Sequence, residues 1–164
     1  PLSNDIIRRI DKILPPFWNK GNPVDLVAEL NFEIATEVVE MLVAWDGCDA
    51  VIPLGMIGLH SLTEAFARIC VKLEPDLQQM FAERIEDMEK KEKIYIENVI
   101  RMMEKYRKPI VGVTLLDSQG KQVVTDLEGC EFKGVSLPTP ERACNTLAAM
   151  VRYAEWLKRE GVEN

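Results

Sequence analysis

The stretch Ile110-Val111-Gly112-Val113-Thr114-Leu115-Leu116 decides the fold class of this chain. It is apolar and rich in β-branched residues, which is typical of a strand buried on both faces of a parallel sheet. The run Ala50-Val51-Ile52-Pro53-Leu54 has the same character, and Pro53 is expected at its end or at a bulge. Residues 132–137 predict a third short strand, and residues 122–125 predict a hairpin strand.

Amphipathic helices are predicted around these strands. Apolar residues recur at helical spacing after Ser3, and again from Asn31 to Trp45. Thr139 has the chemistry of a helix cap, with Pro140 at the first helical position, and the last helix is expected to stop at Gly161. The alternation of helices and strands predicts an α/β domain of three layers, with helices on both faces of a parallel sheet.

A long helical stretch is predicted between the helix that ends near Trp45 and the last helix, which begins after Thr139. Ser61-Leu62-Thr63-Glu64 has the pattern of a capping box, and Pro75 is expected to break or kink the helix. The charged run 83–93 is interpreted as a solvated helix face. Beyond Pro75, apolar residues recur at steps of three and four, interrupted only by Glu92. Residues of about 74–107 are therefore expected to project as a helical hairpin or to contact a partner, with a homo-oligomer as one possibility.

The composition limits the classes of function that this chain can have. The 164 residues are 47% hydrophobic and 29% charged, which fits one folded domain, and the formal charge is −7. An acidic chain argues against a nucleic-acid partner and against an anionic membrane surface. No apolar run is long enough to span a bilayer, and no signal-peptide layout opens the chain. The four cysteines lack C-x-x-C spacing, so they predict reduced thiols in the cytoplasm; Cys70 and Cys144 are expected as small buried residues of helices.

Three places attract a chemical interpretation. His60, the only histidine, could carry a phosphoryl group, but its surroundings favour an ordinary residue near a helix start. Gly55-Met56-Ile57-Gly58 follows a predicted strand, and either cradles a carboxylate or phosphate or forms a tight turn. Asn22, Pro23 and Asp25 are interpreted as anchors of a loop rather than as reacting groups. Neither catalytic residues nor metal ligands are predicted, because no known catalytic or metal motif is present.

Several short elements together resemble a known family. Gly21-Asn22-Pro23-Val24-Asp25-Leu26, Asp49-Ala50-Val51, Lys108-Pro109-Ile110-Val111 and the closing helix from Pro138 to Leu157 occur in the order found in the C-terminal ligase domain of NDP-forming acyl-CoA synthetases. The resemblance covers nearly the whole chain, as a single domain over residues 1–164. It implies a flavodoxin-like fold that lacks the family's first strand and carries a helical insertion at about 74–107.

The resemblance also implies a function. The family joins an acid to CoA with ATP or GTP hydrolysis, reversibly, through acyl-phosphate and phosphohistidine intermediates. Gly55, Met56, Ile57 and Gly58 correspond to a loop that lies near the acid in related succinyl-CoA synthetases. CoA, ATP or ADP, and magnesium are implied for the full enzyme, with none bound by this chain alone. The expected partners are CoA-binding and ATP-grasp type domains or subunits, and the isolated chain is not expected to turn over substrate.

A second interpretation belongs to another class of protein. The chain opens without a methionine and is expected to be a piece of a longer protein. The stretch 74–107 is longer than is usual in the family, and residues 120–133 look more β-like than the short helix expected there. These departures leave open a regulatory or scaffold module of the same fold, such as one within a protein acyltransferase.

Overall fold

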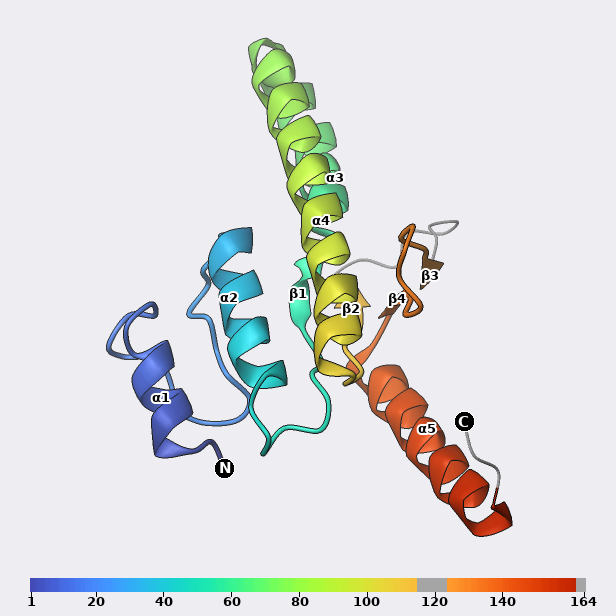
Figure 1. Ribbon diagram of the computed structural model, residues 1–164. Helices are drawn as coiled ribbons and strands as arrows, with labels where there is room; N and C mark the ends of the chain where they lie inside the picture. Colours follow the sequence, from blue (N-terminus) through green and yellow to red (C-terminus); the bar gives the residue numbers. More distant parts are fainter. Residues whose placement is uncertain (115–123, 162–164) are drawn as a thin grey trace.

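The computed structural model describes residues 1–114 and 124–161, and Figure 1 shows their arrangement. Within these residues four short strands and five α-helices form an α/β fold. The predicted turn at 117–120 lies outside the described residues. No helix in the described ranges is both long and apolar enough to cross a membrane.

The sheet has the strand order β1-β2-β4-β3. Strands β1 (Leu54–Ile57), β2 (Val111–Thr114) and β4 (Gly134–Leu137) run parallel, whereas β3 (Val124–Thr125) pairs antiparallel with β4 at one edge. The mostly parallel open sheet confirms the predicted fold class and is compatible with a flavodoxin-like fold. A strand is confirmed at Val124–Thr125, but it pairs with β4 and not with β2, so the predicted hairpin back onto the strand at 110–116 was wrong.

Alternation along the strands separates the two faces of the sheet. Val111 and Val113 of β2 pack with Ala143 of α5 (Pro140–Glu160) on one face. On the other face Ile110 belongs to the main core, and Gly134 of β4 lies beneath α4. Because helices contact both faces, the layered arrangement predicted from the sequence is confirmed.

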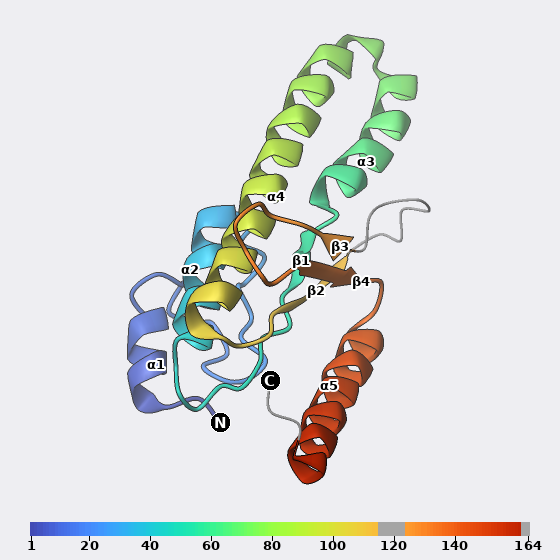
Figure 2. The same cartoon turned by 45° about the vertical axis from the view of Figure 1, so that its right-hand side comes forward.

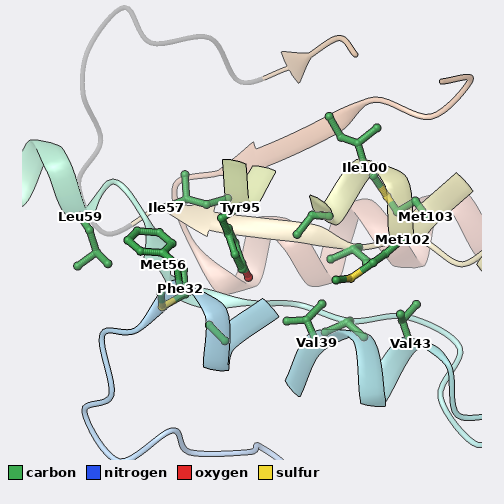
Figure 3. Packing of buried hydrophobic residues seen from close by; sticks show 14 of the residues in the cluster. Phe32, Val39, Val43, Met56, Ile57, Leu59, Tyr95, Ile100, Met102 and Met103 are labelled. Carbon is green, nitrogen blue, oxygen red and sulfur yellow. The ribbon is translucent and has the colours of Figure 1, made fainter. Parts of the chain in front are cut away.

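A helical hairpin rises from the sheet (Figure 2). It consists of α3 (Leu59–Leu73), the short 3-10 helix η1 (Pro75–Leu77) and α4 (Gln78–Tyr106), so the predicted break at Pro75 is confirmed. The first half of α4 projects with α3, whereas the second half returns to the sheet. There Tyr95, Ile100 and Met103 are almost completely buried in the main core (Figure 3).

Two local predictions at the start of this hairpin were wrong. Strand β1 begins at Leu54 and not at Ala50. Val51 makes an isolated parallel bridge with Ile110, and Pro53, which has no N–H, pairs only through its carbonyl, which accepts the Val113 N–H at 2.9 Å. Helix α3 begins at Leu59, so Ser61 lies inside it and does not cap it. The cap residue is Gly58, whose φ of 90° lets the chain turn directly from strand to helix.

Helix α5 starts as predicted but leaves the body of the protein. Thr139 Oγ1 accepts the Arg142 N–H at 3.3 Å, Pro140 is the first helical residue, and Gly161 ends the helix with a φ of 68°. Beyond its first turns the helix projects from the domain (Figure 1). Its large apolar residues Met150, Val151, Tyr153 and Trp156 are exposed. Cys144 is exposed as well, so its predicted burial was wrong.

Helix α2 (Phe32–Val43) lies beside α4, and α1 (Asn4–Ile10) packs against α2. Between α1 and α2 is a second apolar cluster, which includes Trp18. On its other side α2 is joined to α4 through Glu40, whose carboxylate accepts hydrogen bonds from Lys105 Nζ at 2.9 Å and Tyr106 Oη at 2.8 Å. These bonds, that of Lys105 first, hold the pKa of Glu40 below its usual value.

The start of α2 gives a first test of this fold. Asn31 Oδ1 accepts the backbone N–H groups of Glu33 and Ile34 at 2.8 and 3.4 Å, which satisfies two otherwise unbonded donors. We expect Asn31→Ala to lower the free energy of unfolding by about 1 kcal/mol in urea denaturation. Asn31→Asp keeps the acceptor and should be close to wild type; equal stability of all three proteins would contradict the capping role.

Candidate functional site

One cavity brings together two groups of residues singled out in the sequence. It has a volume of about 840 Å³ and lies between the 22–30 loop, α2 and the segment 47–56. Asn22, Pro23 and Asp25 line it from the loop, and Gly55 and Met56 line it from β1. The two groups are separated by about thirty positions in the sequence, so only the folded structure shows that they line the same cavity.

The remaining two residues of the predicted glycine segment lie elsewhere. Ile57 and Gly58 are not in the cavity wall; Ile57 packs in the main core, and Gly58 forms the cap of α3. Gly55 has a φ of 93°, a backbone conformation that favours glycine, and it lies within β1 and not in a loop after the strand. The role of this segment in substrate binding stays a prediction, with Gly55 and Met56 the members that reach the cavity.

The walls of the cavity are mainly apolar. Helix α2 contributes a row of side chains at helical spacing, and Trp45 follows just after the helix; the α2 residues are Ala35, Val38, Val39 and Leu42. Exposure falls across the wall, from 52% and 59% at Leu30 and Leu54 to 1% at Ala35 and Tyr95. The cavity therefore has an exposed mouth and a buried inner part, as ligand sites for apolar groups usually do.

Hydrogen bonds shape the loop at the mouth. Asn19 Oδ1 accepts the N–H of Asp25 at 3.2 Å, and Asn19 Nδ2 donates to the carbonyl of Pro23. Asp25 Oδ1 accepts the N–H of Val27 at 2.8 Å. Val27 and its neighbour Ala28 have φ values of 57° and 59°, which side chains with a Cβ rarely adopt. Asn19 was missed in the sequence, although an asparagine just before a Gly-Asn-Pro turn is a recognisable loop-forming signal.

Tyr95 is the polar group at the inner end of the cavity. Its side chain comes from α4 and its hydroxyl end points toward α2 (Figure 3). The ring packs edge-on against Phe32, with 5.9 Å between ring centroids. Among the described residues its hydroxyl has no hydrogen-bond partner, and it is the only buried side-chain polar atom in that state. Sequence reasoning missed it because its position fits the apolar seam of the helix.

The charged side chains among the described residues that line the cavity are all acidic, namely Asp25, Glu29 and Asp49. A cation contacts the wall without lining the cavity, since Lys108 Nζ donates to the carbonyl of Trp45 at 2.8 Å. Phosphate groups and free carboxylates are usually held by arginine, lysine or helix N-terminal amides. The cavity therefore suits a neutral, largely apolar group and does not fit the phosphates of a nucleotide or of CoA.

A second polar cluster lies at the start of the helical hairpin. His60, the second residue of α3, has its Nδ1 2.8 Å from Glu92 Oε2, and its Nε2 lies 3.1 Å from Ser61 Oγ. A carboxylate can only accept, so the Nδ1 hydrogen is donated to Glu92. Glu92 is only 6% exposed, so the prediction that the whole 83–93 run is solvated was wrong at this residue. His60 near a helix start is confirmed.

Next to this cluster is a smaller cavity of about 340 Å³. Glu89, Glu92, Glu97 and Asp126 face it together with His60 and Lys93. Within residues 1–114 and 124–161 no group of histidine, cysteine or acidic residues is arranged to hold a metal ion. The excess of carboxylates also makes it a poor site for phosphate.

Comparison with known proteins gives one related sequence. The chain is 24% identical over 158 residues to a 4-hydroxybutyrate–CoA ligase (ADP-forming) of Nitrosopumilus maritimus (strain SCM1). The match covers 93% of this chain but 18% of the ligase. No family model and no solved structure matches the chain. The similarity supports a relationship to the NDP-forming acyl-CoA synthetases in general, without pointing to a particular domain.

The buried hydrogen bond between His60 and Glu92 gives a second prediction. In His60→Ala the carboxylate of Glu92 would remain buried without its imidazole partner, so we expect a loss of about 3 kcal/mol of unfolding free energy. Adding Glu92→Met should recover most of that loss, because the buried charge is removed and the side chain fits the apolar seam. Lys91→Ala breaks an exposed pair with Asp87 and should cost about 0.5 kcal/mol or less. Additive effects in the double variant would contradict the coupling.

Proposed function

We propose that this chain is a domain of an NDP-forming acyl-CoA synthetase. The observation that carries the proposal is the similarity to an ADP-forming CoA ligase along 93% of the chain. The mostly parallel sheet and the elements that resemble the ligase domain of that family agree with it. Since the chain spans only 18% of that ligase, the reaction as a whole is proposed for the protein of which this domain is a part.

Within that enzyme the domain would shape the acid side of the active site. The 840 Å³ cavity offers apolar walls from α2 to an acyl chain, with Gly55 and Met56 on the opposite side. Its buried inner part would exclude water from a reactive acyl intermediate. The described residues of the lining include no lysine or arginine, so CoA, the nucleotide and magnesium would be held by the other domains, where the phosphoryl chemistry would also take place.

The partners would be the CoA-binding and ATP-grasp type domains or subunits of the synthetase. The projecting part of α5 exposes Val151, Tyr153 and Trp156, and the rings of the last two stack at 5.7 Å. Contiguous exposed apolar side chains of this kind are common at contacts between domains. The remaining part of a synthetase is therefore the partner that we propose for this helix.

The proposal is tested with the full-length protein that contains this domain. We expect ATP formation from ADP, phosphate and an acyl-CoA, and no such turnover by residues 1–164 alone. Several acyl-CoAs should be compared, each with and without phosphate. Absence of phosphate-dependent turnover by a folded full-length protein, with every acyl-CoA and nucleotide tried, would instead favour the regulatory or scaffold module.

A cavity-filling variant tests the role of the cavity in that reaction. Ala35 lies in the inner wall and is 1% exposed, so the larger side chain of Ala35→Leu would occupy space proposed for the acyl chain. We expect kcat/KM for the acyl-CoA to fall at least tenfold, at about 1.4 kcal/mol of lost binding. Ala82→Leu makes the same change at an exposed position of α4 and should leave the activity unchanged. Thermal unfolding of both variants checks that they are folded; full activity of Ala35→Leu would contradict the assignment of the cavity.

A further inference from the structure

We propose that the hydroxyl group of Tyr95 is a specificity determinant that recognises a neutral oxygen atom near the far end of the acyl chain. This inference rests on the proposed function and adds a substrate class to it. The acyl groups favoured are short chains that end in a hydroxyl or carbonyl group. Chains that end in a second carboxylate are disfavoured.

The first observation is the unpaired state of the hydroxyl. Tyr95 is 1% exposed, and the protein offers its hydroxyl no hydrogen-bond partner among the described residues. Burial of an unpaired hydroxyl is unfavourable, and most such groups in proteins do have a partner. A phenylalanine would make the same edge contact with Phe32 without that penalty. The hydroxyl is therefore best explained by a partner that arrives with a ligand.

The second observation is its location. Tyr95, like Ala35, belongs to the least exposed part of the wall of the 840 Å³ cavity. A chain that enters past Leu30 and Leu54 would bring its far end toward this hydroxyl, while its apolar part contacts the α2 side chains. One oriented polar group in an apolar pocket is the usual means of selecting a ligand by a single substituent.

The third observation is the charge of the surroundings. Burial raises the pKa of Tyr95 above its ordinary value, so the phenol stays neutral and can both donate and accept a hydrogen bond. Asp25, Glu29 and Asp49 line the same cavity without a cation among them. A ligand carboxylate would have to lose its hydration in the presence of these like charges, whereas a hydroxyl or carbonyl group would not. The class of ligand printed in the name of the related ligase, a 4-hydroxy acid, fits this description.

The experiment compares three acyl groups carried on N-acetylcysteamine, a small neutral thiol that replaces CoA. The 4-hydroxybutyryl, butyryl and succinyl thioesters are titrated into the 164-residue chain, and binding is followed by calorimetry and by NMR of residues at the cavity. We expect the 4-hydroxybutyryl thioester to bind about tenfold more tightly than the butyryl thioester, and the succinyl thioester to bind more weakly than either.

The matched variant is Tyr95→Phe, which removes only the hydroxyl. It should abolish the tenfold preference by weakening 4-hydroxybutyryl binding, with butyryl binding unchanged. In the absence of ligand its thermal midpoint should equal or exceed that of the wild type, since an unpaired buried group is removed. Tyr106→Phe is the contrasting control: its hydroxyl donates to Glu40 at 2.8 Å, so its loss should lower the midpoint.

The outcomes distinguish the role of Tyr95 from the assignment of the cavity to an acyl group. Binding of both thioesters with a preference that survives in Tyr95→Phe would overturn the role of Tyr95 and leave the acyl cavity standing. A clear drop in the thermal midpoint of ligand-free Tyr95→Phe would show that the hydroxyl already has a partner in the protein. That result would also overturn the role of Tyr95. Failure of all three thioesters to bind the folded chain would overturn both the inference and the assignment of the cavity to an acyl group.

Discussion

The close packing of α4 onto the sheet is the constraint on which the rest of the structure depends. Ile100 of α4 is fully buried above Gly134 of β4, and a Cβ at position 134 would lie 3.1 Å from Ile100 Cδ1. Such a distance is tighter than an ordinary van der Waals contact, so a side chain at position 134 would push Ile100 away from the sheet, and glycine lets the helix lie this close. At this depth α4 reaches β1, β4 and α2 at once, and the main core forms around it (Figure 3).

The same helix explains why two polar side chains are buried where the sequence shows an apolar seam. Tyr95 and Glu92 are separated by one turn, but they serve different neighbours: Tyr95 faces α2 and the large cavity, whereas Glu92 faces His60 at the start of α3. Glu92 is paired and so contributes to the geometry of the hairpin. Tyr95 is not paired, and this difference makes it a candidate for ligand recognition while Glu92 is explained by the fold.

The sequence predicted the fold more completely than the site, for identifiable reasons. Strand β2, the break at Pro75 and the cap at Thr139 depend on local chemistry that a few neighbouring residues determine. The start of α3 was misplaced because Ser61-Leu62-Thr63-Glu64 has the pattern of a capping box. The helix instead begins directly after Gly58, whose left-handed conformation makes the turn. The meeting of Asn22 and Asp25 with Gly55 depends on how α2 folds across β1, and no local pattern encodes that. Tyr95 was not singled out as a site residue, because a tyrosine at the spacing of an apolar helical seam is expected to be an ordinary core residue.

The charge pattern explains why a domain of this kind would depend on others for its chemistry. Both cavities are lined chiefly by carboxylates among their charged groups, and the chain has a formal charge of −7. Such surroundings repel phosphate, yet acyl-CoA synthesis with a nucleotide requires several phosphate groups to be held in place. In the proposed enzyme this domain would select the acyl chain by shape and by the neutral hydroxyl of Tyr95, and cationic sites in other domains would hold the phosphates. The mouth of the cavity would then have to open toward those sites, so the exposed residues Leu30 and Leu54 would lie at a second domain contact of the proposed enzyme, besides the one proposed for α5.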